Sequence, residues 1–167
     1  MPGRLKAEIG QERPATGWPR HFPSVETEAF LSLVRTAAVL ERDCELLVKA
    51  AGLTLPQLNV LRILRGAGRE GATCGEIARR MIAVDPDLTR LLDRLRRRGW
   101  IERRRSARDR RAVVTRITAA GRELVGTLDE PLLALHRRQF AALGAKKLRR
   151  VLADLEALRA VSLQPGR

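Results

Sequence analysis

The spacing of apolar residues changes once along the middle of this sequence, and that change limits the folds open to it. Before Gly99 the apolar residues recur every three or four positions, most clearly in the leucines of 88–95, which predicts amphipathic helices. After Gly99 the segment 100–117 is rich in β-branched residues and partly alternates, which predicts a β-hairpin. Helices interrupted by a single hairpin favour a mainly α fold with a small β-hairpin wing.

Capping residues divide the helical part into separate elements. Helices are expected over 24–52 and 54–66, each opened by a hydroxyl side chain. Thr73 and Glu76 form a capping box that opens a third helix. Two more helices are expected within 119–162, beyond the hairpin. The first helix is too long to be covered by a small domain alone, so a partner surface is expected to cover it.

The fourth helix is expected to begin at the sequence Asp85-Pro86. Asp85 can cap it, and proline is tolerated at the first helical position because its missing N–H would have no partner there. Gly99 is expected to end this helix. After the hairpin, Thr118 caps a long helix that contains Pro131, which is expected to kink it.

The charge of the chain is concentrated in one segment. Lysine and arginine number 33 against 19 acidic residues, a net charge of +14, and residues 76–116 alone hold fourteen arginines against six acidic residues. A basic excess of this size implies a polyanionic partner, nucleic acid before an anionic membrane surface. Aromatic residues make up only 3%, which argues against the stacking platforms that bind single strands.

Several other classes of protein are not supported. No apolar run reaches the roughly 18 residues of a membrane span, and residues 1–10 lack the apolar core of a secretion signal. Cys44 and Cys74 make no disulfide framework, so reduced thiols and a cytoplasmic location are expected. The two cysteines, together with His21 and His136, lack the spacing of metal ligands, and the sequence shows no nucleophile with a matching general base. Neither a metal, a cofactor nor enzymatic activity is therefore expected.

Helix, helix, short turn, helix and basic hairpin follow one another in the order of a winged helix-turn-helix. In that fold the second helix of the motif enters the DNA major groove with its polar face on the bases. The polar face of helix 86–98 offers five candidate DNA-binding residues: Asp87, Thr89, Arg90, Arg94 and Arg97. The hairpin tip adds three more: Arg108, Arg110 and Arg111. Any one of these arginines is as suited to a phosphate or an acidic neighbour as to a base.

Six short motifs, each present once, follow one another between Leu55 and Gly121. They are Leu55-Pro56-Gln57, the run from Glu76 to Met81, the run from Asp87 to Leu95, Arg98-Gly99-Trp100-Ile101, Asp109-Arg110-Arg111, and the exit from Ile117 to Gly121. Together they closely resemble the MarR (multiple-antibiotic-resistance) transcriptional regulators over residues 55–125. The turn before the fourth helix departs from that pattern, since Ile82, Ala83 and Val84 stand where the family has a glycine and a serine cap. The departure would start the helix later and place carboxylates near the DNA.

The resemblance implies a homodimer that binds a roughly palindromic operator and usually represses a nearby gene. It implies that Thr89, Arg90 and Arg94 contact bases or phosphates, and that Arg111 with Arg110 enters the minor groove. Asp109 would brace the wing through an arginine. Many members release DNA when a phenolic or other small ligand fills a crevice between the dimer helices and the winged domain. Four residues are candidates for that pocket: Phe30, Arg35, Leu58 and His136.

The predicted organisation is a flexible N-terminal arm over 1–23, a helical dimerisation region over 24–52 and 119–162, and a winged helix-turn-helix DNA-binding domain over 53–118. Two other classes of function stay open. One is a non-specific basic protein that binds nucleic acid without ligand control, and the other is an interaction module whose charge serves solubility alone.

Two weaker signals have plain structural explanations. Residues 66–71 spell G-x-G-x-x-G, but they follow a predicted helix rather than a strand, so an interhelical loop is expected there instead of a dinucleotide site. Cys74 lies at a helix start beside basic residues, where its pKa could fall enough for a redox switch. The competing interpretation of Cys74 is a small, half-buried residue.

Overall fold

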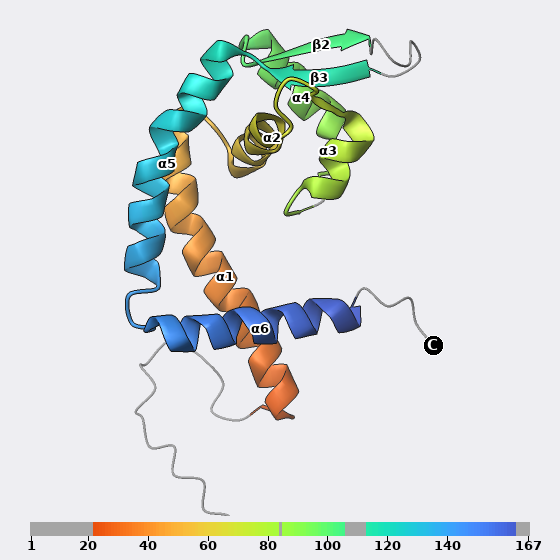
Figure 1. Cartoon of the computed structure of the whole chain (residues 1–167). Coiled ribbons are helices and arrows are strands. Elements are labelled where there is room, and N and C mark those ends of the chain that lie inside the picture. Colours follow the sequence, from red (N-terminus) through yellow and green to blue (C-terminus); the bar gives the residue numbers. More distant parts are fainter. Residues whose placement is uncertain (1–21, 84, 106–112, 163–167) are drawn as a thin grey trace, which may run out of the picture. The chain divides into compact units, whose positions relative to one another are not determined.

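The structure, a computed structural model, describes residues 22–83, 85–105 and 113–162 (Figure 1). The described elements, in chain order, are α1 (Val25–Ala50), α2 (Leu55–Gly66), β1 (Ala72–Thr73), α3 (Cys74–Arg80), α4 (Leu88–Arg97), β2 (Ile101–Arg105), β3 (Val113–Ile117), α5 (Ala119–Gln139) and α6 (Ala145–Ser162). The predicted mainly helical fold with a small hairpin is confirmed. The chain forms two compact units, one ending at Ala37 and one beginning at Ala38.

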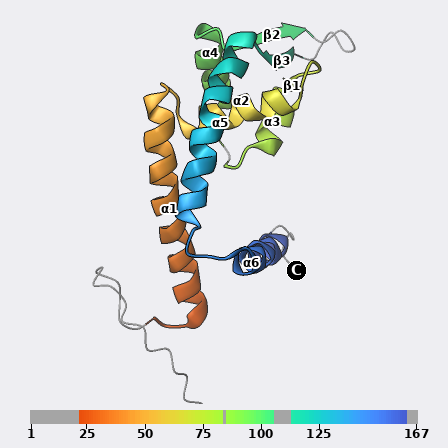
Figure 2. The ribbon, with the colours of Figure 1, turned by 60° about the vertical axis from the view of Figure 1, so that its left-hand side comes forward.

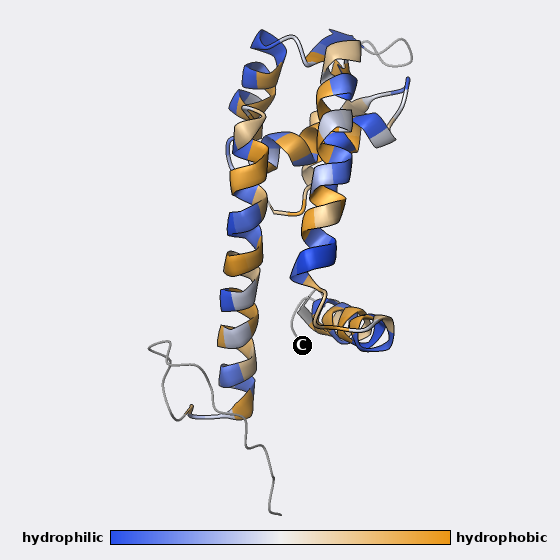
Figure 3. Ribbon diagram, turned by 90° about the vertical axis from the view of Figure 1, so that its left-hand side faces the viewer, coloured by the Kyte–Doolittle hydropathy of each residue, from blue (hydrophilic) through white to orange (hydrophobic). Residues whose placement is uncertain are grey.

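The first unit contains the start of α1. The backbone N–H of Thr27 donates to Ser24 Oγ at 3.2 Å, so Ser24 caps this helix as predicted. The hydrogen bond from Ser24 also lowers the pKa of Glu26 from its usual value. Apolar and polar residues alternate along α1 (Figure 3), and several large apolar side chains in this stretch are exposed. They are Val25, Phe30, Leu31, Leu33 and Val34.

Threonine caps open three helices of the second unit. Thr54 exchanges hydrogen bonds with Gln57, and Thr73 exchanges them with Glu76, so both α2 and α3 begin with a capping box. The Thr73 backbone N–H donates to the Glu76 carboxylate, and this bond lowers the pKa of Glu76 below its usual value. Thr118 Oγ1 accepts from the N–H of Gly121 at 3.1 Å and opens α5.

The expected start of α4 is wrong. The helix begins at Leu88, and Pro86 lies outside it. Asp85 does not cap it: Asp85 Oδ1 accepts the backbone N–H of Asp87 at 2.8 Å, which closes a local turn and uses the carboxylate before the helix begins. Asp87 is the residue that precedes the helix, and its side chain makes no capping hydrogen bond. The later start agrees with the departure from the family pattern.

A three-stranded antiparallel sheet forms the wing and its base, in the order β1-β3-β2. Ile101 pairs with Ile117 at one end of the hairpin and Arg105 with Val113 at the other. The two-residue strand β1, which the sequence did not predict, pairs Ala72 with Thr115. This third strand ties the hairpin to the start of α3.

One apolar core holds the second unit together. It takes residues from α2, α3, α4, the sheet and α5, including Leu61, Leu64, Ile77, Leu92 and Val125, all of them fully buried. Pro131 lies inside α5, which continues to Gln139. No helix in the described ranges is both long and apolar enough to cross a membrane.

An ion-pair cluster fastens α5 to α2, which lies beside it (Figure 2). Arg65 donates to both carboxylate oxygens of Asp129, at 2.6 and 3.0 Å, and Arg62 donates to the same group at 3.2 Å. These bonds, those of Arg65 first, hold the pKa of Asp129 below its usual range.

Replacing Asp129 by asparagine tests this cluster. The lowered pKa means that Asp129 stabilises the fold fully above its usual pKa, and that this contribution is lost as the pH falls through the lowered value. Because the side chains are partly exposed, we expect Asp129→Asn to lower the free energy of unfolding by about 1 kcal/mol or less near pH 7. Urea unfolding near pH 7 and near pH 3 should show that difference shrink in acid. Asp154→Asn, on exposed α6, is the control, and an equal effect of both variants would contradict the cluster's role.

Candidate nucleic-acid interface

Helix α4 has one buried and one exposed face. Its four leucines, Leu88, Leu91, Leu92 and Leu95, are at most 7% exposed. The other face presents Thr89, Arg90, Arg94, Arg96 and Arg97 to solvent, and Arg98 follows directly after the helix. The leucine stripe therefore fixes the rotation of the helix and holds a row of arginines outward. Arg90, Asp93, Arg94, Arg96 and Arg97 line a shallow depression there.

Some of these arginines already have partners. Arg98 donates to the carbonyl oxygen of Gly52 at 3.2 Å and lies 5.0 Å from the centre of the Trp100 ring, so it supports the fold. Arg90 pairs with Asp87 at 3.4 Å, although Arg90 is 82% exposed. Among residues that the structure describes, Arg94 and Arg97 have no acidic partner. Arg94 and Arg97 are thus the cations of α4 most available to an external anion.

Asp93 joins α4 to the hairpin, a contact that the sequence did not predict. Its carboxylate lies 3.6 Å from Arg103 of β2 and 3.9 Å from Arg96. Arg103 is only 26% exposed, and its Nε is buried without a hydrogen-bond partner. Asp93 therefore offsets the cost of a half-buried cation and fixes the hairpin against α4.

The turn before α4 is held from α2. Asn59 Oδ1 accepts the backbone N–H of Ile82 at 2.9 Å. The Ile82 side chain itself is 91% exposed. Asn59 is a positioning residue that sequence analysis missed, because its partner lies 23 residues further along the chain and across the turn.

The hairpin presents more basic charge near its tip. Arg104 and Arg105 are exposed on β2, and Arg104 pairs with Glu102 at 2.9 Å. The tip itself, with the predicted residues Arg108, Asp109, Arg110 and Arg111, lies outside the described residues. Of the eight predicted DNA-binding residues, the structure thus places five on α4 or directly before it: Asp87, Thr89, Arg90, Arg94 and Arg97.

The four candidate pocket residues have different surroundings. Leu58 is 4% exposed and belongs to the core, while His136 Nδ1 lies 3.2 Å from Gln139 Oε1 on the exposed side of α5. Phe30 and Arg35 belong to the first unit, and Phe30 is exposed. The depression on the exposed face of α4 includes none of these four residues.

The remaining motifs do not form a second site. The glycine-rich segment 66–71 follows α2 and leads into β1, so it is the interhelical loop that the sequence predicted. Burial raises the pKa of the Cys44 thiol, which disfavours the reactive thiolate. Cys74 is half-buried, and its redox role stays a hypothesis. The described residues contain no cluster of metal-ligating side chains.

Similarity to known proteins agrees with this architecture. The model of the MarR family matches residues 53–113. A solved MarR transcription factor from Planctomyces limnophilus is 36% identical over 82% of this chain and 99% of its own, with a TM-score of 0.62. The repressor Rv2887 of Mycobacterium tuberculosis is 29% identical over 75% of this chain and 89% of its own. Sco3205 of Streptomyces coelicolor, solved in complex with DNA, is 20% identical over 90% of this chain and 95% of its own, with a TM-score of 0.76.

The chain spans only 48% and 59% of the length of two other curated relatives, at 35% and 32% identity. The matched proteins are described as transcription factors, regulators or repressors, and one as a transcriptional activatory protein, in agreement with the expectation that this chain is not an enzyme. The winged architecture of the second unit and the 36% identity to a MarR transcription factor over nearly all of that protein lead to one assignment: this chain belongs to the MarR family.

Proposed function

We propose that this protein is a cytoplasmic transcriptional repressor that binds a palindromic operator as a homodimer. The observation that supports it best is the outward row of arginines on α4, with Arg94 and Arg97 free of acidic partners among the described residues. Arg94 suits a bidentate contact to a guanine edge, and Thr89 and Arg97 suit neighbouring bases or phosphates. Asp87, half-exposed at the helix start, can accept from a cytosine amino group when Arg90 turns to a phosphate.

The homodimer rests on apolar surface that the described chain leaves uncovered. Leu152, Leu158 and Val161 of α6 are each at least 57% exposed, as are Phe30 and Val39 of α1. Surface of this kind marks a protein interface more often than a solvated face. We assign dimerisation to 24–52 and 119–162 and DNA binding to 53–118. Residues 1–21 of the predicted N-terminal arm over 1–23 lie outside the described residues.

A gel shift separates this function from its alternatives. The duplex upstream of the protein's own gene should shift at concentrations that leave an unrelated duplex unshifted at the same salt, and the footprint should be a palindrome with half-sites about one helical turn apart. Equal affinity for both duplexes would favour a non-specific basic protein. Absence of binding to either duplex would leave an interaction module. A reporter gene downstream of the palindrome should become more active when the protein is deleted.

Release by a small aromatic or phenolic effector is the remaining part of the proposal. Phe30, Arg35, Leu58 and His136 are the candidate pocket residues. A thermal-shift screen of small aromatic acids, phenols and drug-like cations should find a compound that both stabilises the protein and weakens the operator complex. A ligand that stabilises the protein without weakening that complex would argue against control by release.

The wing supplies a separate prediction. In the proposed complex Arg111, with Arg110, inserts into the minor groove, where narrow A·T tracts attract guanidinium groups. We expect Arg111→Ala to weaken operator binding by roughly 5- to 150-fold, the range of one good specific contact, without changing the thermal melting of the protein. Arg108→Ala should weaken binding less, as expected for a phosphate contact. An Arg111→Ala protein that binds as tightly as wild type would remove the wing from the interface.

A further inference from the structure

The net charge of this chain divides into two clusters, and the proposed function uses only one. Residues 76–116 hold a net charge of +8, and residues 131–153 hold +6 with no acidic residue among them. The rest of the chain contains thirteen basic and thirteen acidic residues and is neutral. The second cluster is called the basic corner, and its members are Arg137, Arg138, Lys146, Lys147, Arg149 and Arg150.

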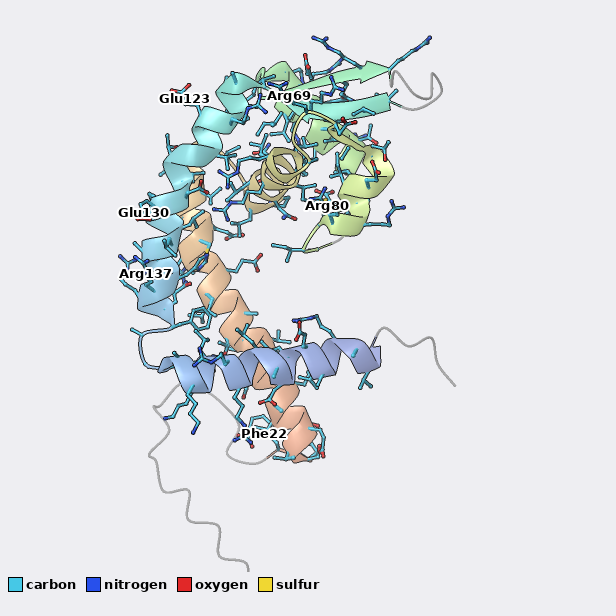
Figure 4. All side chains as sticks on the ribbon, in the orientation of Figure 1. Phe22, Arg69, Arg80, Glu123, Glu130 and Arg137 are labelled. Carbon is cyan, nitrogen blue, oxygen red and sulfur yellow. The ribbon has the colours of Figure 1, made fainter. Side chains whose placement is uncertain are left out.

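The basic corner is an ordered part of the second unit. It comprises the end of α5, the connection 140–144 and the first turns of α6 (Figure 4 labels Arg137). The backbone fixes this connection: Leu143 N donates to Phe140 O at 2.9 Å, and Leu148 N donates to Gly144 O at 3.0 Å. All six basic side chains are exposed. The backbone therefore holds the attachment points of these six cations close together.

The charge of the corner is not balanced within the described chain. None of its six cations pairs with a carboxylate there. The first turn of α6 contains no acidic residue, although this end of a helix has the positive end of its dipole. Lys146 also stands three and four residues from Arg149 and Arg150, at spacings where like charges repel. Each of these features destabilises the isolated helix, and a bound polyanion would replace the repulsion with attraction.

Dimerisation would leave the corner accessible. On α6 the apolar residues Leu148, Val151, Leu152 and Leu155 follow the i, i+3, i+4, i+7 spacing of one helix face. The four corner residues of α6 lie off this stripe: Lys146 and Arg150 are on the opposite face, and Lys147 and Arg149 flank the stripe. A second copy that packs on the apolar stripe would therefore leave the cations in solvent.

We propose that the basic corner is a second contact site for duplex DNA, which grips the phosphate backbone without regard to sequence. This proposal rests on the proposed function, because DNA held at α4 raises the local concentration of the same polymer around the corner. Helix α5 has 21 residues and separates the corner from the wing by about 30 Å, so the corner would meet a different stretch of duplex. An anionic membrane is less well matched, because Leu148 and Leu155 of the apolar stripe are already half-buried.

The test compares two full-length variants that lose the same charge. The corner variant contains Lys146→Ala, Lys147→Ala, Arg149→Ala and Arg150→Ala. The control variant removes four exposed cations outside both clusters, through Arg42→Ala, Lys49→Ala, Arg69→Ala and Arg159→Ala. Affinity for a long mixed-sequence duplex is measured over a range of salt concentrations. In a second assay, protein bound to an immobilised short operator duplex is asked to capture a labelled second duplex.

Affinity falls as salt rises, and we expect this dependence to be weaker in the corner variant. The slope of log affinity against log salt should become less negative by about 3 to 4, as the loss of four phosphate contacts predicts. The corner variant should also fail to capture the second duplex, while its affinity for the short operator stays that of wild type. The control variant should behave as wild type in both assays. Unchanged slope and capture in the corner variant would overturn the proposal.

Two further results keep this proposal distinct from the proposed function. If Arg94→Ala with Arg97→Ala weakens operator binding while the corner variant changes nothing, only the corner proposal fails. If that double variant also changes nothing, the interface at α4 fails. A last outcome concerns membranes. If wild type sediments with phosphatidylserine vesicles in a salt-dependent way and the corner variant does not, while both capture the second duplex equally well, the corner binds membranes and the DNA site is overturned.

Discussion

Replacing Gly71 by alanine is expected to lower the free energy of unfolding by roughly 2–5 kcal/mol. Gly71 has a φ of +72°, a conformation that L-residues with a side chain adopt at a cost. A Cβ there would also collide with the carbonyl oxygen of Thr115, and it would lie 2.6 Å from Arg116 Cγ and 2.8 Å from Val114 Cγ1. Because Thr115 is buried and pairs with β1, neither side of this contact can give way easily.

Gly68 provides the matched control for this prediction. It too has a positive φ, +61°, but a Cβ at Gly68 would meet no atom within 4 Å. Gly68→Ala should therefore cost only the conformational part, about 1–2 kcal/mol. Urea unfolding followed by circular dichroism gives both values. Equal losses in the two variants would mean that β1 does not pack against β3 as described.

The second large effect concerns DNA. Arg94→Ala, if Arg94 makes a bidentate base contact in the proposed complex, should weaken operator binding by about 1–3 kcal/mol and relax specificity at one position. Addition of Arg97→Ala should lower the slope of log affinity against log salt by about 1 more if Arg97 meets a phosphate. Both side chains are exposed and neither pairs within the described residues, so thermal melting should not change. Fluorescence anisotropy at several salt concentrations measures these quantities.

Arg98, the residue directly after α4, is the contrasting arginine. It donates to Gly52 and stacks on Trp100, so Arg98→Ala should lower the melting temperature and leave the salt slope of DNA binding as it is. If Arg98→Ala instead lowers the slope and Arg94→Ala does not, the two arginines have been assigned the wrong roles.

Much of the fold follows from local sequence. The threonine caps at 54, 73 and 118 each satisfy N–H groups within three residues, so the information that starts those helices is short-range. The leucine stripe of 88–95 likewise determines which face of α4 is buried. For this reason the row of exposed arginines could be predicted from spacing alone.

What was missed depends on neighbours distant in the chain. A two-residue strand has no periodicity, and β1 exists because Gly71 lets the backbone approach Thr115. The start of α4 was misplaced because Asp85 has two competing uses, a helix cap and a local turn, and the sequence does not rank them. Which arginines have an acidic partner also depends on tertiary contacts, since Asp93 meets Arg103 only after the hairpin folds against α4.

The attachments of α5 have a mechanical consequence. Near its first turn, Thr118 donates to the carbonyl oxygens of both Gly99 and Trp100, and Asp129 holds α2 about 16 Å further along the helix. A rod fixed to a body at one point can swivel, but a rod fixed at two points must turn with that body. In the proposed dimer, any change of angle between the two copies of α5 would therefore turn the arginines of α4 through the same angle. The distance between the two copies of α4 would then be set by the dimerisation region.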